Sequence, residues 1–296
     1  MDKFQKNNRI VNVLNEALSI ANEVSMASST IGNMVLNSIK SRQFQKSPIV
    51  GTAFKKGNFS TQIGKENVTI IWEFYNILNE FPENRMLRLR GESDYANRTI
   101  KLTIVAIRGR YDRNDFFQTV QHEVSHLFER GKRHKPYKNL DAYKESINVL
   151  NSGLGNNRFD NLKGAIANVI YISHKFEQRA FANGAYMYLM KSDDYFNRFR
   201  DAIKETRLYQ YLIVVDDVEY LIERYIEGGN SIEKYLQAYG LNITQFLNLI
   251  RDTKKNISKL IGRIIVKAIE DYRESHEIHE IVEPFEINRK ILEFLK

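Results

Sequence analysis

The sequence predicts an α+β protein that is mostly helical, with a small sheet placed before a long series of helices. Segments rich in β-branched and aromatic residues are concentrated before residue 108, whereas helical periodicity dominates from about residue 114 onward. A hydrophobic fraction of 43% over 296 residues supplies enough apolar material for a full core. We expect a helical segment over residues 1–50, a core over 51–191 and a helical extension over 192–296, which could form one continuous domain.

The first hundred residues are predicted as a helix followed by strands. Residues 9–43 keep apolar side chains on one helical face, although the small polar run 25–30 could break this helix in two. Turns are favoured around the prolines and glycines of residues 48–64. Residues 59–63 and 67–76 could form a hairpin, while the second of these segments also fits a helical period. Residues 86–90 and 98–107 are predicted as clearer strands.

The next helix has well-marked ends. Asn114 or Asp115 is a suitable N-cap and Gly131 a suitable C-terminal stop, with Lys132 and Arg133 placed favourably for the helix dipole. Further helices are predicted over residues 139–151, 159–173, 175–191 and most of 195–296, separated by the runs SGLGNN, SDD and EGGNS.

Composition excludes several kinds of function. The absence of cysteine excludes disulfides, thiolate zinc sites and cysteine nucleophiles, so any metal must be held by histidine and carboxylate. Neither a membrane-spanning stretch nor a signal-like start is present, and a cytoplasmic protein without membrane contact is therefore expected. The net charge of +8 is compatible with a polyanionic partner, but we do not favour nucleic acid on this ground alone.

The motif H-E-x-x-H stands at His122, Glu123 and His126, inside the well-marked helix. Histidines four residues apart on a helix project to the same side, so both imidazoles can reach one zinc ion while the intervening glutamate reaches a water molecule beside it. The apolar residues of this helix form one broad stripe on the opposite side: Phe116, Phe117, Val120, Val124, Leu127 and Phe128. This pattern is typical of an active-site helix whose face opposite the ligands is buried.

A catalytic zinc usually has three protein ligands, and Glu177 is the favoured third one. Its segment is apolar around nearly the whole helix, where an ionised carboxylate is costly unless it is paired or bound to a metal. Ala180 and Gly184 would allow close helix packing beside it. Glu145 is a weaker alternative because its helix is polar, and His174 could be a ligand, a hydrogen-bond donor to the site or a polar residue at a helix junction.

These residues resemble the zincin metallopeptidases, and specifically the gluzincin arrangement in which a glutamate on a later helix follows H-E-x-x-H. Residues 177–186 also resemble the E-x-x-A pattern of the ImmA/IrrE-like peptidases of bacteria and their phages. The resemblance covers roughly residues 98–190. The chain departs from the family pattern by placing Glu177 51 residues after His126 (177 minus 126), through two additional predicted helices.

The resemblance implies a zincin-like catalytic core that hydrolyses peptide or protein substrates. His122, His126 and Glu177 would hold Zn²⁺, and Glu123 would act as general base and later pass the proton to the leaving amine. The oxyanion of the intermediate also needs a donor. The candidates near Glu177 in sequence are Tyr171, His174, Arg179 and Tyr186.

Other interpretations of the function remain open. A zincin-like fold could serve a non-catalytic interaction or virion-associated protein, although such a protein has no use for Glu123. A DNA-binding regulator is a third reading, but residues 192–296 contain no convincing helix-turn-helix signature. His276 and His279 could share a helical face without an evident third ligand. The basic run 131–138 fits a helix end and turn, and the eight basic residues from Arg85 to Arg113 fit a solvated strand face.

Overall fold

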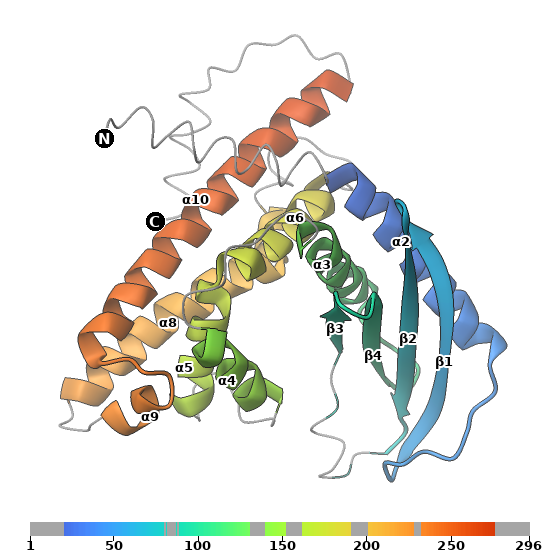
Figure 1. The fold of residues 1–296 in the computed structure, drawn as a ribbon, viewed down its shortest axis with the longest axis horizontal. Coiled ribbons are helices and arrows are strands. Elements are labelled where there is room, and N and C mark those ends of the chain that lie inside the picture. The colour runs from blue at the N-terminus through green and yellow to red at the C-terminus, as the bar shows by residue number, and fades with distance from the viewer. Residues whose placement is uncertain are drawn as a thin grey trace. The chain divides into compact units, whose positions relative to one another are not determined.

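The computed structural model describes residues 21–79, 81, 87, 89–130, 140–151, 162–190, 201–227 and 232–275. Within these residues the protein is α+β and mostly helical, as the sequence predicts, and contains a small mixed sheet (Figure 1). The chain divides into two compact units, Met1–Arg133 and His134–Lys296. The division into three parts at residues 50 and 191 stays a prediction.

The first unit contains a four-stranded sheet with strand order β1-β2-β4-β3. Strand β2 pairs antiparallel with β1 and parallel with β4, and β3 pairs antiparallel with β4. The central strands β2 and β4 alternate buried apolar and more exposed residues, which orients one face of the sheet toward the core. The strands are β1 (Thr52–Ile63), β2 (Glu66–Ile77), β3 (Arg90–Asp94) and β4 (Thr99–Ile107).

The hairpin predicted from the sequence is confirmed, and the helical alternative for residues 67–76 is wrong. Gly64 occupies the turn with φ of 59°, a conformation that glycine adopts without steric cost. The strand predicted over residues 86–90 is placed too early, because the observed strand starts at Arg90. Residues 86 and 88 lie outside the described part of the chain, and residues 87 and 89 are not in a strand.

Two helices of the first unit, α2 (Ala21–Ser41) and α3 (Arg113–Arg130), contribute to the same hydrophobic core as the sheet. Figure 1 shows both helices beside the strands. The predicted break at residues 25–30 is wrong, because α2 continues through this run and the buried Ser28 hydroxyl donates to the Val24 carbonyl at 2.5 Å. That bond satisfies the only side-chain polar group of Ser28 inside the helix. Residues 9–20 of the predicted helix lie outside the described residues.

The start of α3 is fixed by Asp112. Its Oδ1 accepts a hydrogen bond from the Asp115 backbone N–H at 2.9 Å, and its carbonyl accepts one from Phe116. Asp112 is therefore the N-cap, and the predicted caps Asn114 and Asp115 are wrong by two or three residues. A carboxylate at this end also interacts favourably with the helix dipole. The predicted stop at Gly131, with Lys132 and Arg133, lies outside the described residues.

The described part of the second unit is helical. Helix α10 packs against α5, α6 and α8, and α5 also packs against α4. These elements agree with the helices predicted after residue 139; the predicted breaks lie almost wholly outside the described residues. The helices are α4 (Leu140–Asn151), α5 (Leu162–Ser173), α6 (Lys175–Met190), α8 (Arg207–Glu227), α9 (Glu233–Gln237) and α10 (Ile243–Ser275).

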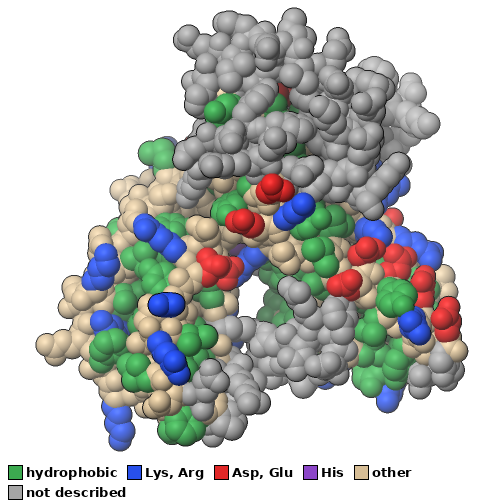
Figure 2. Space-filling view, turned by 180° about the vertical axis from the view of Figure 1, so that it is seen from behind, with side chains coloured by type: hydrophobic (Ala, Val, Ile, Leu, Met, Phe, Trp, Pro, Cys, Tyr) green, Lys and Arg blue, Asp and Glu red, His purple; other side chains and the backbone are tan. Residues whose placement is uncertain are grey.

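The surface combines basic and acidic side chains with neutral and hydrophobic ones (Figure 2). On the face drawn in Figure 2, lysine and arginine side chains are scattered rather than gathered into one continuous stripe. A continuous basic stripe is the usual electrostatic footprint of a nucleic-acid-binding face. Of the helices that the described residues form, none has the combination of length and apolar character needed to cross a membrane.

Candidate metal centre

The two histidines of the motif lie together on helix α3. The Nε2 atoms of His122 and His126 are 3.0 Å apart, and the ring planes are inclined at 84°. Both side chains are buried, with 4% and 6% of their surface exposed. The helical spacing of four residues therefore directs two imidazole nitrogens toward one point, as the sequence predicts.

The opposite side of α3 holds this helix in place. Phe116, Val120 and Val124 are fully buried and belong to the same core cluster as the inward-facing residues of β2 and β4. Helix α2 also packs on α3, where Gly32 lies so close to the Phe117 ring that an added Cβ would be 2.4 Å from it. The predicted apolar stripe is confirmed, and it fixes the rotation of the helix that carries the histidines.

Glu123, the residue between the histidines, is also buried, with 6% of its surface exposed. Its side chain lies against Gly91 of the edge strand β3. Strand β3 thus borders the carboxylate that the sequence predicts as the general base.

Glu177 lies in the first turn of α6 in the second unit and has only 1% of its surface exposed. The Tyr143 hydroxyl donates to its Oε1 and the Tyr171 hydroxyl donates to its Oε2, each at 2.5 Å. Three helices, α4, α5 and α6, therefore supply this one carboxylate group and its donors. Helix α6 is buried around most of its circumference, in agreement with the apolar character of its sequence.

The junction between α5 and α6 positions Glu177. The Gln178 side-chain amide donates back across the junction to the Ile172 carbonyl at 2.9 Å, and the Gln178 backbone N–H donates to His174. These bonds satisfy the carbonyl groups of Ile172 and His174 at the end of α5, and α6 begins after a single bend at His174. The carboxylate of Glu177 is placed near the N-terminal end of α6, where the helix dipole favours negative charge.

The four residues proposed from the sequence as oxyanion donors lie on α5, on α6 or at the junction between them, and two of their hydroxyls already have acceptors. The Tyr171 hydroxyl donates to Glu177, and the Tyr186 hydroxyl donates to Asp271 on α10. His174 packs against the Tyr143 ring, with ring centroids 4.5 Å apart, and Arg179 is half-buried. Before Tyr171 or Tyr186 could donate a hydrogen bond to an oxyanion, its hydroxyl would have to break the hydrogen bond that it now donates to a carboxylate.

The surroundings shift the pKa values of Tyr171 and His174, two residues beside Glu177. Burial raises the pKa of Tyr171 well above its ordinary value, and the charge of Glu177 raises it further. Burial lowers the pKa of His174, although the Glu177 carboxylate acts in the opposite direction. Tyr171 is therefore a protonated donor at neutral pH.

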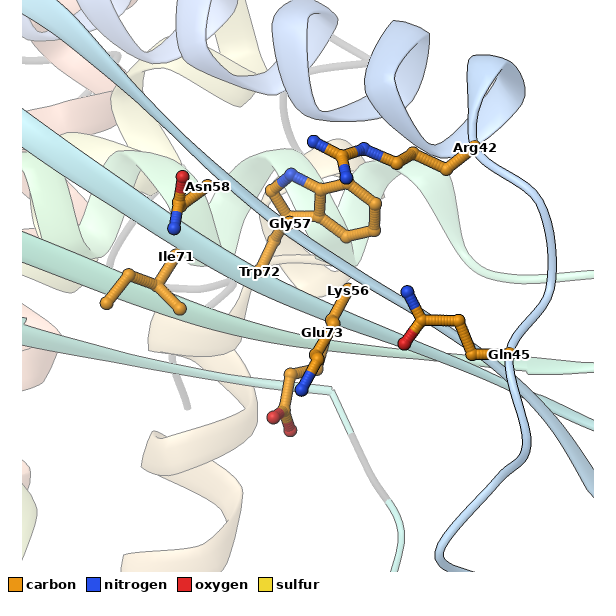
Figure 3. Close-up of a pocket in the computed structure, with 8 residues that line it drawn as sticks. All are labelled: Arg42, Gln45, Lys56, Gly57, Asn58, Ile71, Trp72 and Glu73. Carbon is orange, nitrogen blue, oxygen red and sulfur yellow. The ribbon is translucent and has the colours of Figure 1, made fainter.

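A separate pocket of the first unit lies at strands β1 and β2 (Figure 3). Its volume is about 360 Å³, and its lining combines two cations, two amides and one carboxylate with the Trp72 indole. It contains no histidine, so it lacks the donor set that the histidine pair of α3 offers to zinc. The lining residues are Arg42, Gln45, Lys56, Gly57, Asn58, Ile71, Trp72 and Glu73.

The remaining sequence candidates lie elsewhere. Glu145, the alternative ligand, is half-buried on α4, where its charge contributes to the raised pKa of Tyr239. His134, His276, His279 and the basic run 131–138 lie outside the described residues.

Sequence reasoning missed two residues that contact the predicted site residues: Tyr143, which bonds to Glu177, and Gly91, which lies against Glu123. Tyr143 is separated from Glu177 by 34 residues, so no local pattern could connect them. Gly91 lies in a polar segment of five residues whose role as a strand depends on pairing with β4. A glycine within a strand is itself a signal of close approach by another group, but it does not say which group.

Comparison of the chain with protein-family models, with curated proteins and with solved structures yields no match.

Proposed function

We propose that the protein is a zinc-dependent hydrolase, and specifically a peptidase, with Glu123 as general base. The observation that carries the proposal is the approach of two buried histidine Nε2 atoms to 3.0 Å on helix α3. Two nitrogens that share one tetrahedral zinc ion at the usual bond length would be about 3.3 Å apart, so the pair needs little adjustment to bind it.

Glu177 is the third ligand in this proposal. His122, His126 and Glu177 are all buried and are all ligand types that zinc accepts. The two tyrosine bonds fix the orientation of the Glu177 carboxylate. Each carboxylate oxygen can accept more than one partner, so a hydrogen bond from a tyrosine does not by itself prevent that oxygen from binding a metal. Hydrogen bonds from surrounding residues to a ligating carboxylate are a usual feature of metal sites.

The donor set and the general base support peptide-bond hydrolysis. When bound, zinc would acidify a water molecule and polarise the substrate carbonyl group. The Glu123 carboxylate takes a proton from the attacking water as the new C–O bond forms. Glu123 then gives that proton to the amine as the C–N bond breaks, so the base is restored at the end of the cycle.

A non-catalytic interaction or virion-associated protein with a structural metal is the alternative from another class. Such a site needs the histidines but makes no use of Glu123. The position of Glu123 between the histidines and against a strand edge favours the enzyme.

Metal content and cleavage should be measured together on the purified chain. We expect one zinc ion per wild-type chain, with chelator-sensitive cleavage of a peptide library. Glu123→Gln should keep the zinc and lose at least about 100-fold in kcat, because a positioned general base contributes 10²–10⁴-fold. His122→Ala and Glu177→Ala should lose the zinc itself.

Glu145→Ala is the matched control, since it removes the alternative carboxylate and should retain both zinc and cleavage. Stoichiometric zinc in Glu177→Ala would refute that ligand assignment. A wild-type chain that binds no zinc after reconstitution would remove the hydrolase proposal and leave the interaction protein as the better account.

A further inference from the structure

Gly91 provides the space that the Glu123 side chain occupies. A Cβ added at Gly91 would lie 2.4 Å from Glu123 Cγ, 2.6 Å from its Oε1 and 2.8 Å from its Cδ. Non-bonded carbon atoms prefer separations of about 3.5–4.0 Å, so any larger residue at position 91 is incompatible with this arrangement of Glu123.

The backbone of β3 does not itself require a glycine at this position. Gly51, Gly64 and Gly109 of the first unit have positive φ, whereas Gly91 does not. Gly91 also keeps its regular antiparallel pairing with Leu102 of β4. An alanine would therefore fit the strand, and the contact with Glu123 is what excludes it.

Two other glycines of this unit that also lack a positive φ allow similar close approaches, but to aromatic rings. Gly32 faces the Phe117 ring, and Gly57 faces the Trp72 indole, with a built Cβ 2.4 Å and 2.7 Å from the nearest ring atom respectively. These contacts serve core packing. Gly91 differs because it accommodates an ionisable side chain, the one that carries the proposed proton transfer.

We infer that Gly91 is a positioning residue for the general base, an inference that rests on the proposed hydrolase function. A glutamate side chain has several rotatable bonds, and the main chain of β3 limits where its carboxylate can lie. Displacement of a reacting group by about 1 Å can cost on the order of 100-fold in rate. The absence of a side chain at position 91 thus acts on catalysis through Glu123 and not through the histidines.

Gly91→Ala tests the inference on the full chain. We expect it to retain one zinc ion per chain and the wild-type KM while kcat falls about 10- to 100-fold. In a Glu123→Gln background the same substitution should cause no further loss, because the displaced group is already inactive. Gly57→Ala is the matched control: it lies in the same sheet and should lower stability through Trp72, with kcat per folded molecule unchanged.

A measurement that does not depend on activity follows from the same contact. If Gly91→Ala lowers the melting temperature, adding Glu123→Ala should restore it, since the clashing Cγ, Cδ and Oε1 atoms are then absent. Unrestored stability would overturn the inference.

The outcomes separate the two proposals. A wild-type chain that neither binds zinc nor cleaves peptides would remove both. Normal cleavage by the wild type together with wild-type kcat in Gly91→Ala would overturn the positioning role alone. An equal loss from Gly91→Ala in the Glu123→Gln background would also overturn it, because the strand would then act independently of Glu123.

Discussion

Tyr143 is a single residue on which the proposed zinc affinity depends. Its hydroxyl donates to Glu177 Oε1 at 2.5 Å, and its ring packs against His174 and Phe176. Tyr143→Phe removes the donor and keeps the ring. We expect zinc affinity, measured by competition with a chromogenic chelator, to fall about 10-fold or more, the usual effect of losing a hydrogen bond to a metal ligand.

The exposed Tyr220 of α8 offers a control, because its hydroxyl accepts a hydrogen bond from Arg224, and Tyr220→Phe should leave zinc affinity unchanged. Equal affinities for Tyr143→Phe and the wild type would show that the Tyr143 hydroxyl does not orient a metal ligand.

Tyr75 should make the protein sensitive to alkaline pH. Burial, followed by the charge of Glu73 and a hydrogen bond to it, raises the pKa of Tyr75 from 10.0 to about 12. The folded chain then keeps this proton in a range where the unfolded chain releases it. The stabilisation is therefore fully present below about pH 10 and is lost as the pH rises from about 10 through 12.

Melting temperatures measured from about pH 8 to 11 should consequently decline at the alkaline end, and Tyr75→Phe should make that decline shallower. The decline would not vanish, because burial also raises the pKa of Tyr239 to about 12. An identical alkaline slope in Tyr75→Phe would contradict the assignment to Tyr75.

At the scale of elements, the sequence pattern correctly predicted the strands and helices in which buried residues recur at the strand or helix period. The alternation at residues 100–106 predicts β4, and the apolar stripe of α3 predicts both the helix and the position of His122 and His126 on its opposite side. The burial of Glu177 agrees with the apolar character of its segment, whereas the zinc ligands, expected from the H-E-x-x-H motif and that segment, stay a prediction. These features depend only on residues close in the sequence.

The sequence pattern did not predict the features that depend on strand pairing or on helix capping. Strand β3 consists of Arg-Gly-Glu-Ser-Asp, which has no apolar alternation, and it exists because β4 offers a free edge. The N-cap of α3 is Asp112 and not Asn114 or Asp115, because the Asp112 carboxylate accepts a hydrogen bond from the Asp115 N–H. Several polar residues near this point are suitable caps by type, so the sequence does not single out Asp112. The contacts of Gly91 and Tyr143 depend on tertiary structure, so the sequence could not reveal them.

At the scale of the whole molecule, the proposed ligands belong to different compact units. His122 and His126 lie in Met1–Arg133, and Glu177 lies in His134–Lys296. A metal that binds all three would be linked to the folding of both units. Free zinc at about 1,000 times its dissociation constant would stabilise the bound form by about 4 kcal/mol.

Hydrogen exchange with and without zinc tests this linkage directly. We expect zinc to slow exchange in the strands and α3 of the first unit and also in α4, α5 and α6 of the second. In Glu177→Ala the effect on the second unit should disappear, whereas Glu145→Ala should preserve it in both. Zinc protection confined to the first unit of the wild type would mean that the histidines bind the metal without Glu177, and the third ligand would then have to be sought within Met1–Arg133.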